Sequence, residues 1–425
     1  MIMLSLGIDI GTSGVRMAVI DADGAVISTA RGAHPPQPGN RMDARLWWQA
    51  VHHCLTAQIA ALRRIGRNPD EITDLACDGT SGTMVLVDDA LTPVTDALMY
   101  NSAGFEAEAR RIAEYADPGS ITLGANSALA RMLRLQALDA AGHGRHLLHQ
   151  ADYVAACLCG TPVGSDDNNA LKLGFDPESQ SWPDWFAAAG VRVATLPDIH
   201  RPGDVVGLIA PALATTLGFR PGLRVHAGTT DSIAAFIAGG ASETGDAVTS
   251  LGSTLAIKLL SDTRVDDAAS GVYSHRLHGR WLAGGASNTG GAVLAHYFSP
   301  AELEMLSSRI DISTPCPLAY YPLLKPGERF PVNDPMLAPR LTPRPTRPEA
   351  FLYGMLDGMA RIERQAYDRL SSLGAPYPQR VFTCGGGAAN AVWSKLRHRH
   401  LARPILAGAS GEASVGAAHL ARTGP

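Results

Sequence analysis

Short apolar runs that end in glycine and hydroxyl residues recur along this chain. The first covers residues 4–10, turns through 11–14 and resumes as a second apolar run to residue 20. Runs of this length bounded by turn residues predict buried strands. An Asp-Gly pair at 23–24 adds a hairpin turn, so we expect two or three strands within residues 1–35.

Further helices and strands are predicted by the same patterns. Apolar residues recur with helical spacing at 43–65, where Asp43 is a candidate N-cap, and helical stretches also cover about 103–116 and 127–141. Later helices are expected at 232–237 and 390–397, and strands at 72–77, 84–87, 247–251, 255–260, 380–383 and in the run that leads into the turn at 228–231. A strand–turn–strand unit with hydroxyls at its turn thus occurs near residue 9 and again near residue 252, which fits a duplicated domain.

Composition limits the classes of function. The 425 residues suggest two or three domains, and 46% hydrophobic residues suffice for real cores. A net charge of −4 argues against a nucleic-acid or membrane-surface partner. We find neither an apolar stretch long enough for a membrane span nor a signal peptide. The six scattered cysteines are interpreted as free thiols of a cytoplasmic protein.

The turn after the first strand is the first candidate for chemistry. Glycines allow a backbone to approach a phosphate, hydroxyls add donors, and a neighbouring carboxylate can hold a divalent cation. An ordinary β-hairpin with a polar turn is the alternative interpretation. The usual phosphate-binding loop ends in Gly-Lys-Ser/Thr, which is absent here. The residues concerned are Asp9, Gly11, Thr12, Ser13 and Arg16.

A matching turn lies in the second half of the chain and consists of Gly252, Ser253 and Thr254. Two such turns facing one another would clamp a polyphosphate from both sides. That arrangement suits phosphoryl transfer, because catalysis there is mostly positioning and charge neutralisation.

Three further motifs each allow two interpretations. Asp231 follows a Gly-Thr-Thr turn at an expected helix start, where it is either a base for a substrate hydroxyl or an N-cap. The glycines at 385–387, followed by Asn390, either let a flat group such as adenine lie on the backbone or form a plain strand-to-helix turn. The hydroxyl-rich residues 78–83 either recognise sugar hydroxyls or cap their own turn.

In this order, the five turns resemble those of the FGGY carbohydrate kinases, which belong to the sugar kinase–actin–Hsp70 superfamily. The matching segments are 9–16 and 251–254 for the two phosphate motifs, 227–231 for the catalytic aspartate and 384–393 for the adenosine motif. The resemblance implies an α/β fold of two ribonuclease-H-like domains with an active-site cleft between them. We expect residues 1–239 to bind the sugar and carry the catalytic aspartate, and residues 240–425 to bind ATP.

The resemblance also implies roles for individual residues. Asp231 would be the general base for the terminal hydroxyl of the sugar, and Asp9, also catalytic, would help to place Mg²⁺ and the substrate. Ser81, together with Asp9 and Asp231, would contact the sugar. The ATP site would comprise Gly11, Thr12, Ser13, Arg16, Gly252, Ser253, Thr254, Gly386, Gly387 and Asn390.

A narrower resemblance links the chain to short kinases of cyanobacteria and plants, a group that acts on D-ribulose. Many xylulose kinases carry Trp-x-Asp-x-Arg where residues 100–104 read Tyr-Asn-Ser-Ala-Gly, which counts against D-xylulose. The family's first signature usually has lysine and tryptophan where this chain has Arg131 and leucines within 133–135. The segments that carry the narrower resemblance are 78–83, 98–101, 169–174, 227–236, 247–254 and 284–288.

The expected function is therefore transfer of phosphate from Mg·ATP to the terminal hydroxyl of a ketopentose, with D-ribulose as the leading acceptor. The protein is expected to be a cytoplasmic monomer or homodimer. Kinases for D-xylulose, L-ribulose or another polyol are alternatives within the same chemistry. A non-catalytic, sugar-responsive regulatory protein on the same scaffold is an alternative of another class, although it would not need a base at Asp231.

Overall fold

Strand β1 (Leu4–Ile10) lies within the first of two six-stranded sheets in a computed structural model that describes residues 3–35 and 42–423. All seven of its residues are buried, as an apolar run before a glycine turn predicts. It pairs antiparallel with β2 (Gly14–Ile20), which pairs antiparallel with β3 (Val26–Ala33). The predicted strands at the start of the chain are therefore confirmed.

Three neighbouring strands of this sheet run parallel. Strand β4 (Ile72–Gly79) pairs with β1, and β10 (Arg224–Thr230) pairs with β4, so the carboxyl ends of all three meet at one edge. Strand β9 (Val205–Leu208) completes the sheet antiparallel to β10. This edge is where an open α/β sheet places its ligands.

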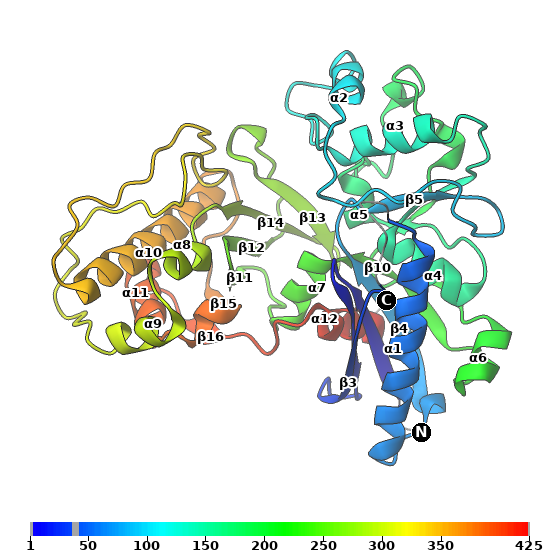
Figure 1. Ribbon diagram of the computed structural model, residues 1–425, viewed down its shortest axis with the longest axis horizontal. Helices are drawn as coiled ribbons and strands as arrows, with labels where there is room; N and C mark the ends of the chain where they lie inside the picture. The colour runs from blue at the N-terminus through cyan, green and yellow to red at the C-terminus, as the bar shows by residue number, and fades with distance from the viewer. Residues whose placement is uncertain (1–2, 36–41, 424–425) are drawn as a thin grey trace. The chain divides into compact units, whose positions relative to one another are not determined.

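Helices cover both faces of the first sheet (Figure 1). One face packs against α1 (Arg45–Arg64) and α4 (Gln150–Cys159). The other packs against α7 (Asp231–Ala238) and α12 (Ala413–Arg422). The apolar side chains of β1 and β4 thus share one core with α1 and α4, which fixes the sheet on that side.

Helix α12 returns to this first unit from the far end of the chain. The chain forms one compact unit up to Ala238, a second over Gly239–Gly411, and re-enters the first at Glu412. We had placed residues from 412 onward in the second domain. They join the first because two glycines permit close packing of backbone: a Cβ at Gly7 would lie 1.9 Å from the carbonyl oxygen of Ser414, and one at Gly416 would lie 1.7 Å from that of Ala234.

The second unit shares part of the strand arrangement of the first. In both sheets the first strand pairs antiparallel with the second and parallel with a later strand, β4 beside β1 and β15 beside β11, whereas in the second sheet β14 lies between β12 and β13. This shared arrangement supports the duplicated domain that the repeated turn predicted. The strands, in sheet order, are β13 (Tyr273–Leu277), β14 (Arg280–Ser287), β12 (Leu255–Ser261), β11 (Asp246–Leu251), β15 (Arg380–Cys384) and β16 (Ile405–Ala407).

The remaining helices and strands lie outside the two six-stranded sheets. The predicted helices at 43–65, 103–116 and 127–141 are present but shorter, and α1 begins after Ala44, with Asp43 accepting a hydrogen bond from the backbone of Arg45. In the first unit these elements are η1 (Pro69–Glu71), β5 (Met84–Val87), α2 (Glu106–Ala113), α3 (Ala128–Leu138), β6 (His146–His149), β7 (Ser165–Asp166), α5 (Asp167–Leu171), η2 (Asp184–Phe186), η3 (Val193–Thr195), β8 (Ile199–His200) and α6 (Pro211–Leu217). In the second they are η4 (Ala268–Ser270), α8 (Gly291–Tyr297), α9 (Pro300–Ser307), α10 (Pro348–Ser372), η5 (Gly386–Ala389) and α11 (Ala391–Leu401).

Two further expectations concern thiols and membranes. All six cysteines fall within the described residues and are free, with Cys54, Cys77 and Cys384 buried. Across residues 3–35 and 42–423, none of the helices has both the length and the apolar character needed to cross a membrane.

A fully buried ion pair ties together the core of the second unit. The guanidinium of Arg397, on α11, donates two hydrogen bonds of 2.6 and 2.7 Å to the carboxylate of Glu363, on α10. Arg397 also donates to Thr383 on β15 at 2.7 Å, and Thr249 on β11 donates to Glu363 at 2.6 Å. The pair therefore joins two helices to two strands, and its charges are matched where water cannot reach them.

Replacing Arg397 by Met should destabilise this unit strongly, because the charge of Glu363 would stay buried without its partner. We expect the free energy of unfolding, measured by denaturant titration, to fall by about 3 to 5 kcal/mol. Arg364→Met is the control, since Arg364 lies on α10, next to Glu363, and forms an exposed ion pair with Asp368. Its loss should cost less than about 1 kcal/mol. Equal losses in the two variants would contradict the role given to the buried pair.

Candidate active site

Three carboxylates gather at the edge where β1, β4 and β10 end. Asp9 and Asp78 are direct neighbours in the parallel register of β1 and β4. Asp231 follows Thr230, which is paired with Gly79 at the end of β4. The sequence analysis selected Asp9 and Asp231 but missed Asp78, although it also ends an apolar strand just before a glycine.

The Asp9 carboxylate has a cationic partner. Arg16, opposite it on β2, donates a hydrogen bond of 3.0 Å to one carboxylate oxygen, and the Arg16 guanidinium also lies 3.8 Å from the carboxylate of Glu412. Burial nevertheless raises the pKa of Asp9, since the loss of hydration outweighs the attraction of Arg16. Arg16 was predicted to bind ATP, and the structure places it in this ion pair.

Asp78 is the more unusual of the two neighbouring carboxylates. Its side chain is fully buried, and neither oxygen accepts a hydrogen bond from a donor group within the described residues. Burial, followed by the negative charges of Asp9 and Asp231, raises the pKa of Asp78 well above its usual range. Such an unsatisfied carboxylate is costly, which makes it a candidate for function.

Asp231 stands at the first residue of α7, the helix start that the sequence predicts. Its carboxylate accepts a hydrogen bond of 2.6 Å from the backbone N–H of Ser232, as an aspartate at a helix start does. The side chain is only half-buried, and its charge acts on Asp78.

The turn between β1 and β2 is held by its own backbone. The N–H of Gly11 donates to the carbonyl of Gly14 at 2.9 Å, and a ring nitrogen of His34 lies 2.8 Å from the carbonyl of Gly11. Thr12 and Ser13 are exposed at the tip of this turn. The hydroxyls predicted to bind phosphate are therefore accessible.

Of the three hydroxyl groups in the turn after β4, two form hydrogen bonds within the protein and one has no partner among the described residues. Thr80 donates to Gln150 at 2.8 Å and contacts Thr83 at 2.6 Å, so these two hydroxyls cap their own turn. The Ser81 hydroxyl oxygen is buried and has no hydrogen-bond partner among the described residues. Of the three, Ser81 is the one left to bind a ligand, which fits its predicted contact with a sugar.

Arg131 holds this turn in place and was noted from the sequence only as a departure from the family signature. Its buried guanidinium donates to the carbonyls of Gly82 at 2.5 Å, Tyr100 at 2.8 Å and Asn126 at 3.1 Å. Desolvation lowers the pKa of Arg131 to about 10. The arginine thereby fixes the segment at 100–104 beside the turn that carries Ser81.

A cavity of about 930 Å³ in the second unit is lined by five of the ten predicted nucleotide residues. Its size and largely apolar lining are typical of a site for a small organic ligand. Trp393 and Leu251 form part of its wall, with the starts of α8 and α11 beside them. The predicted residues that line it are Gly252, Ser253, Gly386, Gly387 and Asn390.

Among the predicted nucleotide residues of the second unit, Thr254 and Asn390 differ from the glycines and Ser253 in their surroundings. Thr254 is exposed on the β11–β12 turn and is not part of the cavity lining. Asn390 lines the cavity, but its side chain caps α11 by accepting from the N–H of Trp393 at 3.0 Å, and it donates to Ser307 at 2.9 Å. Gly385 has φ of +86°, so the turn into η5 needs glycine for its backbone conformation.

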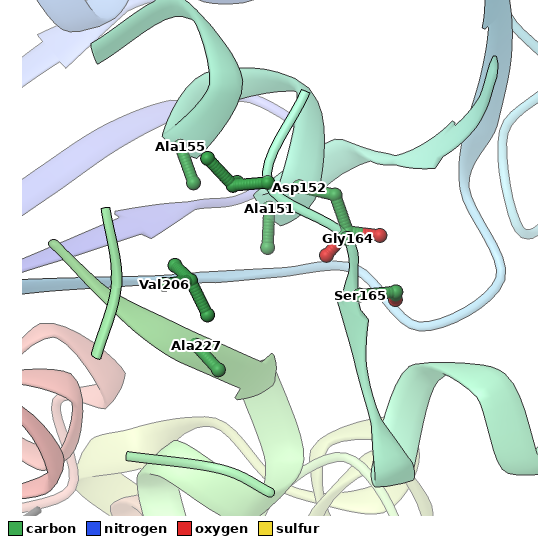
Figure 2. A pocket seen from close by; sticks show the side chains of 9 residues that line it. Ala151, Asp152, Ala155, Gly164, Ser165, Val206 and Ala227 are labelled. Carbon is green, nitrogen blue, oxygen red and sulfur yellow. The ribbon is translucent and has the colours of Figure 1, made fainter. Parts of the chain in front are cut away.

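A second cavity, in the first unit, is too small for a substrate. Its volume of about 10 Å³ corresponds to one water molecule. Figure 2 shows Asp152 of α4, Ser165 of β7 and Ala227 of β10 around it. We assign it no catalytic role.

No group of three or more histidine, cysteine, aspartate or glutamate side chains in the described segments is arranged to hold a metal ion. Asp9 and Asp78, which are neighbours in the register of β1 and β4, form a pair of oxygen donors. This is consistent with the way Mg²⁺ is usually bound, through one or two carboxylates together with substrate phosphates and water.

Comparison with known proteins gives consistent matches along the chain. The N-terminal domain of the FGGY family of carbohydrate kinases matches residues 4–238, and its C-terminal domain matches residues 247–423. Xylulose kinase of Escherichia coli (strain K12) is 23% identical over 419 residues, which cover 92% of this chain and 83% of that protein. Human sedoheptulokinase is 30% identical over 247 residues, or 48% of this chain and 49% of that protein.

Solved structures show the same fold. A xylulose kinase from Rhodospirillum rubrum superimposes with a TM-score of 0.84 at 22% identity, covering 98% of this chain and 89% of that one. The two-domain α/β fold implied by the resemblance is therefore confirmed, whereas the narrower likeness to D-ribulose kinases stays a prediction. With both family domains matched in order along nearly its whole length, the chain belongs to the FGGY family of carbohydrate kinases.

Proposed function

We propose that this protein is an ATP-dependent kinase that phosphorylates the terminal hydroxyl of a ketopentose. The observation that carries the proposal is the group of carboxylates at the ends of β1, β4 and β10, with the half-buried Asp231 at a helix start. A regulatory protein that only binds sugar would not need a base there. Membership of the FGGY family supports the same chemistry.

In the proposed reaction, Asp231 accepts the proton of the sugar's terminal hydroxyl. The hydroxyl oxygen then forms a bond to the γ-phosphorus of ATP while the bond from that phosphorus to the β,γ-bridging oxygen breaks, and ADP leaves. Because little covalent chemistry falls to the protein, positioning and charge neutralisation account for most of the catalysis. Ser81 and Asp9 would orient the sugar, since the Ser81 hydroxyl has no other partner in the described structure.

The second unit would bind the nucleotide in the cavity of about 930 Å³. Gly386 and Gly387 offer a flat backbone surface to adenine, and Asn390 shapes the wall through its cap of α11. Thr12 and Ser13 in the first unit, and Gly252 to Thr254 in the second, would contact phosphate oxygens. When bound, Mg²⁺ would neutralise phosphate charge, and the donor chemistry of Asp9 fits this cation.

Two observations bear on which ketopentose is the acceptor, and they support different sugars. The curated relatives include xylulose kinases, which supports D-xylulose. The segment at 100–104 lacks the charged pair of many xylulose kinases, and it lies against the turn of Ser81 through Arg131, which supports D-ribulose. We propose D-ribulose as the main acceptor and D-xylulose as the second candidate.

The first test is ADP release with Mg·ATP and either D-ribulose, D-xylulose, L-ribulose or no sugar. We expect release that depends on sugar and is fastest with D-ribulose. Faster release with D-xylulose would overturn the choice of acceptor but keep the kinase. Release that is equal with and without sugar would contradict sugar phosphorylation.

Asp231→Asn should abolish most of the turnover, because the amide cannot accept the hydroxyl proton. We expect kcat to fall by about 10²- to 10⁴-fold, while the affinity for ADP in isothermal titration stays unchanged. Asp89→Asn is a suitable control, because Asp89 is an exposed aspartate of the same unit. A variant at Asp231 with the wild-type kcat would exclude this residue as the base.

Alanine substitutions at two adjacent glycines should affect nucleotide binding and stability separately. A Cβ at Gly386 would have no atom within 4 Å, whereas one at Gly387 would lie 2.6 Å from the Trp393 ring and 2.7 Å from Leu251. We expect Gly386→Ala to unfold at the wild-type temperature but to bind ADP about fivefold more weakly, since its methyl group enters the cavity. Gly387→Ala should lower the unfolding temperature instead. Unchanged ADP binding in Gly386→Ala would argue against adenine at this surface.

A further inference from the structure

Asp78 has a position that the proposed roles of its neighbours do not explain. It is the only member of the three-carboxylate group that is fully buried, and it lies at the end of β4 between the strands that carry the other two. Neither of its oxygens accepts a hydrogen bond from a donor among the described residues. It contacts the carboxyl group of Asp9, so the repulsion between the two carboxylates is relieved either by a proton shared between them or by a bound cation.

The charges around this edge are unbalanced. Asp9 and Asp78 are neighbours, the charges of Asp9 and Asp231 act on Asp78, and the charge of Glu412 acts on Asp9. The positive charge that acts on both Asp9 and Asp78 is that of Arg16. Arg16 is directed to one oxygen of Asp9 and is half exposed, so it does not reach the oxygens of Asp78 through a hydrogen bond. One guanidinium does not balance this group of carboxylates, and a cation bound by Asp9 and Asp78 would reduce the excess of negative charge.

From this geometry we infer that Asp78 is a second protein ligand, with Asp9, for the divalent cation of the reaction. The inference rests on the proposed function for the identity of the cation as Mg²⁺. A hard cation takes oxygen ligands and is usually held by one or two carboxylates, with phosphate and water completing its shell. The two neighbouring, buried carboxylates supply such a pair, and the unpartnered oxygens of Asp78 provide the free acceptors.

The location of Asp78 also favours binding of a cation over binding of the sugar. Its side chain is fully buried, whereas Ser81 on the following turn already offers an unpartnered hydroxyl for the sugar. A carboxylate that bound only the sugar would gain no partner for its charge. A cation supplies that partner to Asp9 and Asp78 at once.

The test is direct binding of Mn²⁺ to the full chain without nucleotide, followed through the electron paramagnetic resonance signal of free Mn²⁺. The variant is Asp78→Asn, which keeps the shape of the side chain but removes its charge. The matched control is Asp74→Asn on the same strand. Asp74 is also buried, but it accepts hydrogen bonds of 2.7 Å from both Arg224 and His226, so it has no need of a cation.

We expect Asp78→Asn to weaken Mn²⁺ binding by about tenfold or more, and Asp74→Asn to leave it unchanged. Thermal unfolding should show opposite effects: a midpoint at or above the wild-type value for Asp78→Asn, since a desolvated acid beside Asp9 is removed, and a lower one for Asp74→Asn, since its hydrogen bonds with Arg224 and His226 are weakened. Wild-type Mn²⁺ affinity in the folded Asp78→Asn variant would overturn the inference.

Kinetics distinguish this inference from the proposed function. If Asp78 holds the cation, the concentration of Mg²⁺ needed for half-maximal ADP release should rise in Asp78→Asn, with little change in the KM for the sugar. A raised KM for the sugar with unchanged Mn²⁺ binding would assign Asp78 to the sugar instead and overturn the inference. Absence of sugar-dependent turnover in the wild type would count against the kinase, whereas the Mn²⁺ titration would still decide on the cation ligand.

Discussion

The close approach of α12 to β1 and α7 is the constraint on which the arrangement of the first unit depends. At Gly7 and Gly416 backbone meets backbone, and even a methyl group would lie within 2 Å of a carbonyl oxygen. This packing sets the distance between the strand that ends in Asp9 and the helix that begins with Asp231. A helix contributed by the last residues of the described chain thus helps to position chemistry that begins at residue 9.

The close packing of α12, β1 and α7 allows the edge of the sheet to hold Asp78, a buried carboxyl group whose local environment is unfavourable. Asp78 is buried without a hydrogen-bond donor, and the nearby charges of Asp9 and Asp231 increase the cost of ionising it. The apolar side chains of β1 and β4 hold the two strands in register whatever the state of these carboxylates. Sites where local rules fail within a well-packed frame are expected to be functional.

Local patterns predicted much of this structure, because strand ends are marked by adjacent residues. An apolar run followed by glycine located Asp9, and the start of α7 located Asp231. Features that depend on distant contacts were not predicted. The return of α12 requires the fit of Gly416 against Ala234, and the function of Arg131 emerges only when its three carbonyl partners come together. Asp78 had a local signal, but its lack of partners is visible only in three dimensions.

The same contacts bear on how the site could distinguish between ketopentoses. D-ribulose and D-xylulose differ only in the configuration at C3, so one hydroxyl points in a different direction and no charge differs. The segment at 100–104 contains no charged residue. Arg131 donates hydrogen bonds to the carbonyls of Tyr100, in this segment, and Gly82, in the turn of Ser81. If the acceptor is a ketopentose, as proposed, discrimination would come from whether Ser81 and its neighbours gain or lose a hydrogen bond. Leaving one buried polar group unpaired costs about 1 to 3 kcal/mol. A difference of that size favours one epimer about 5- to 150-fold, so both sugars would react at high concentration and the preference would appear in kcat/KM.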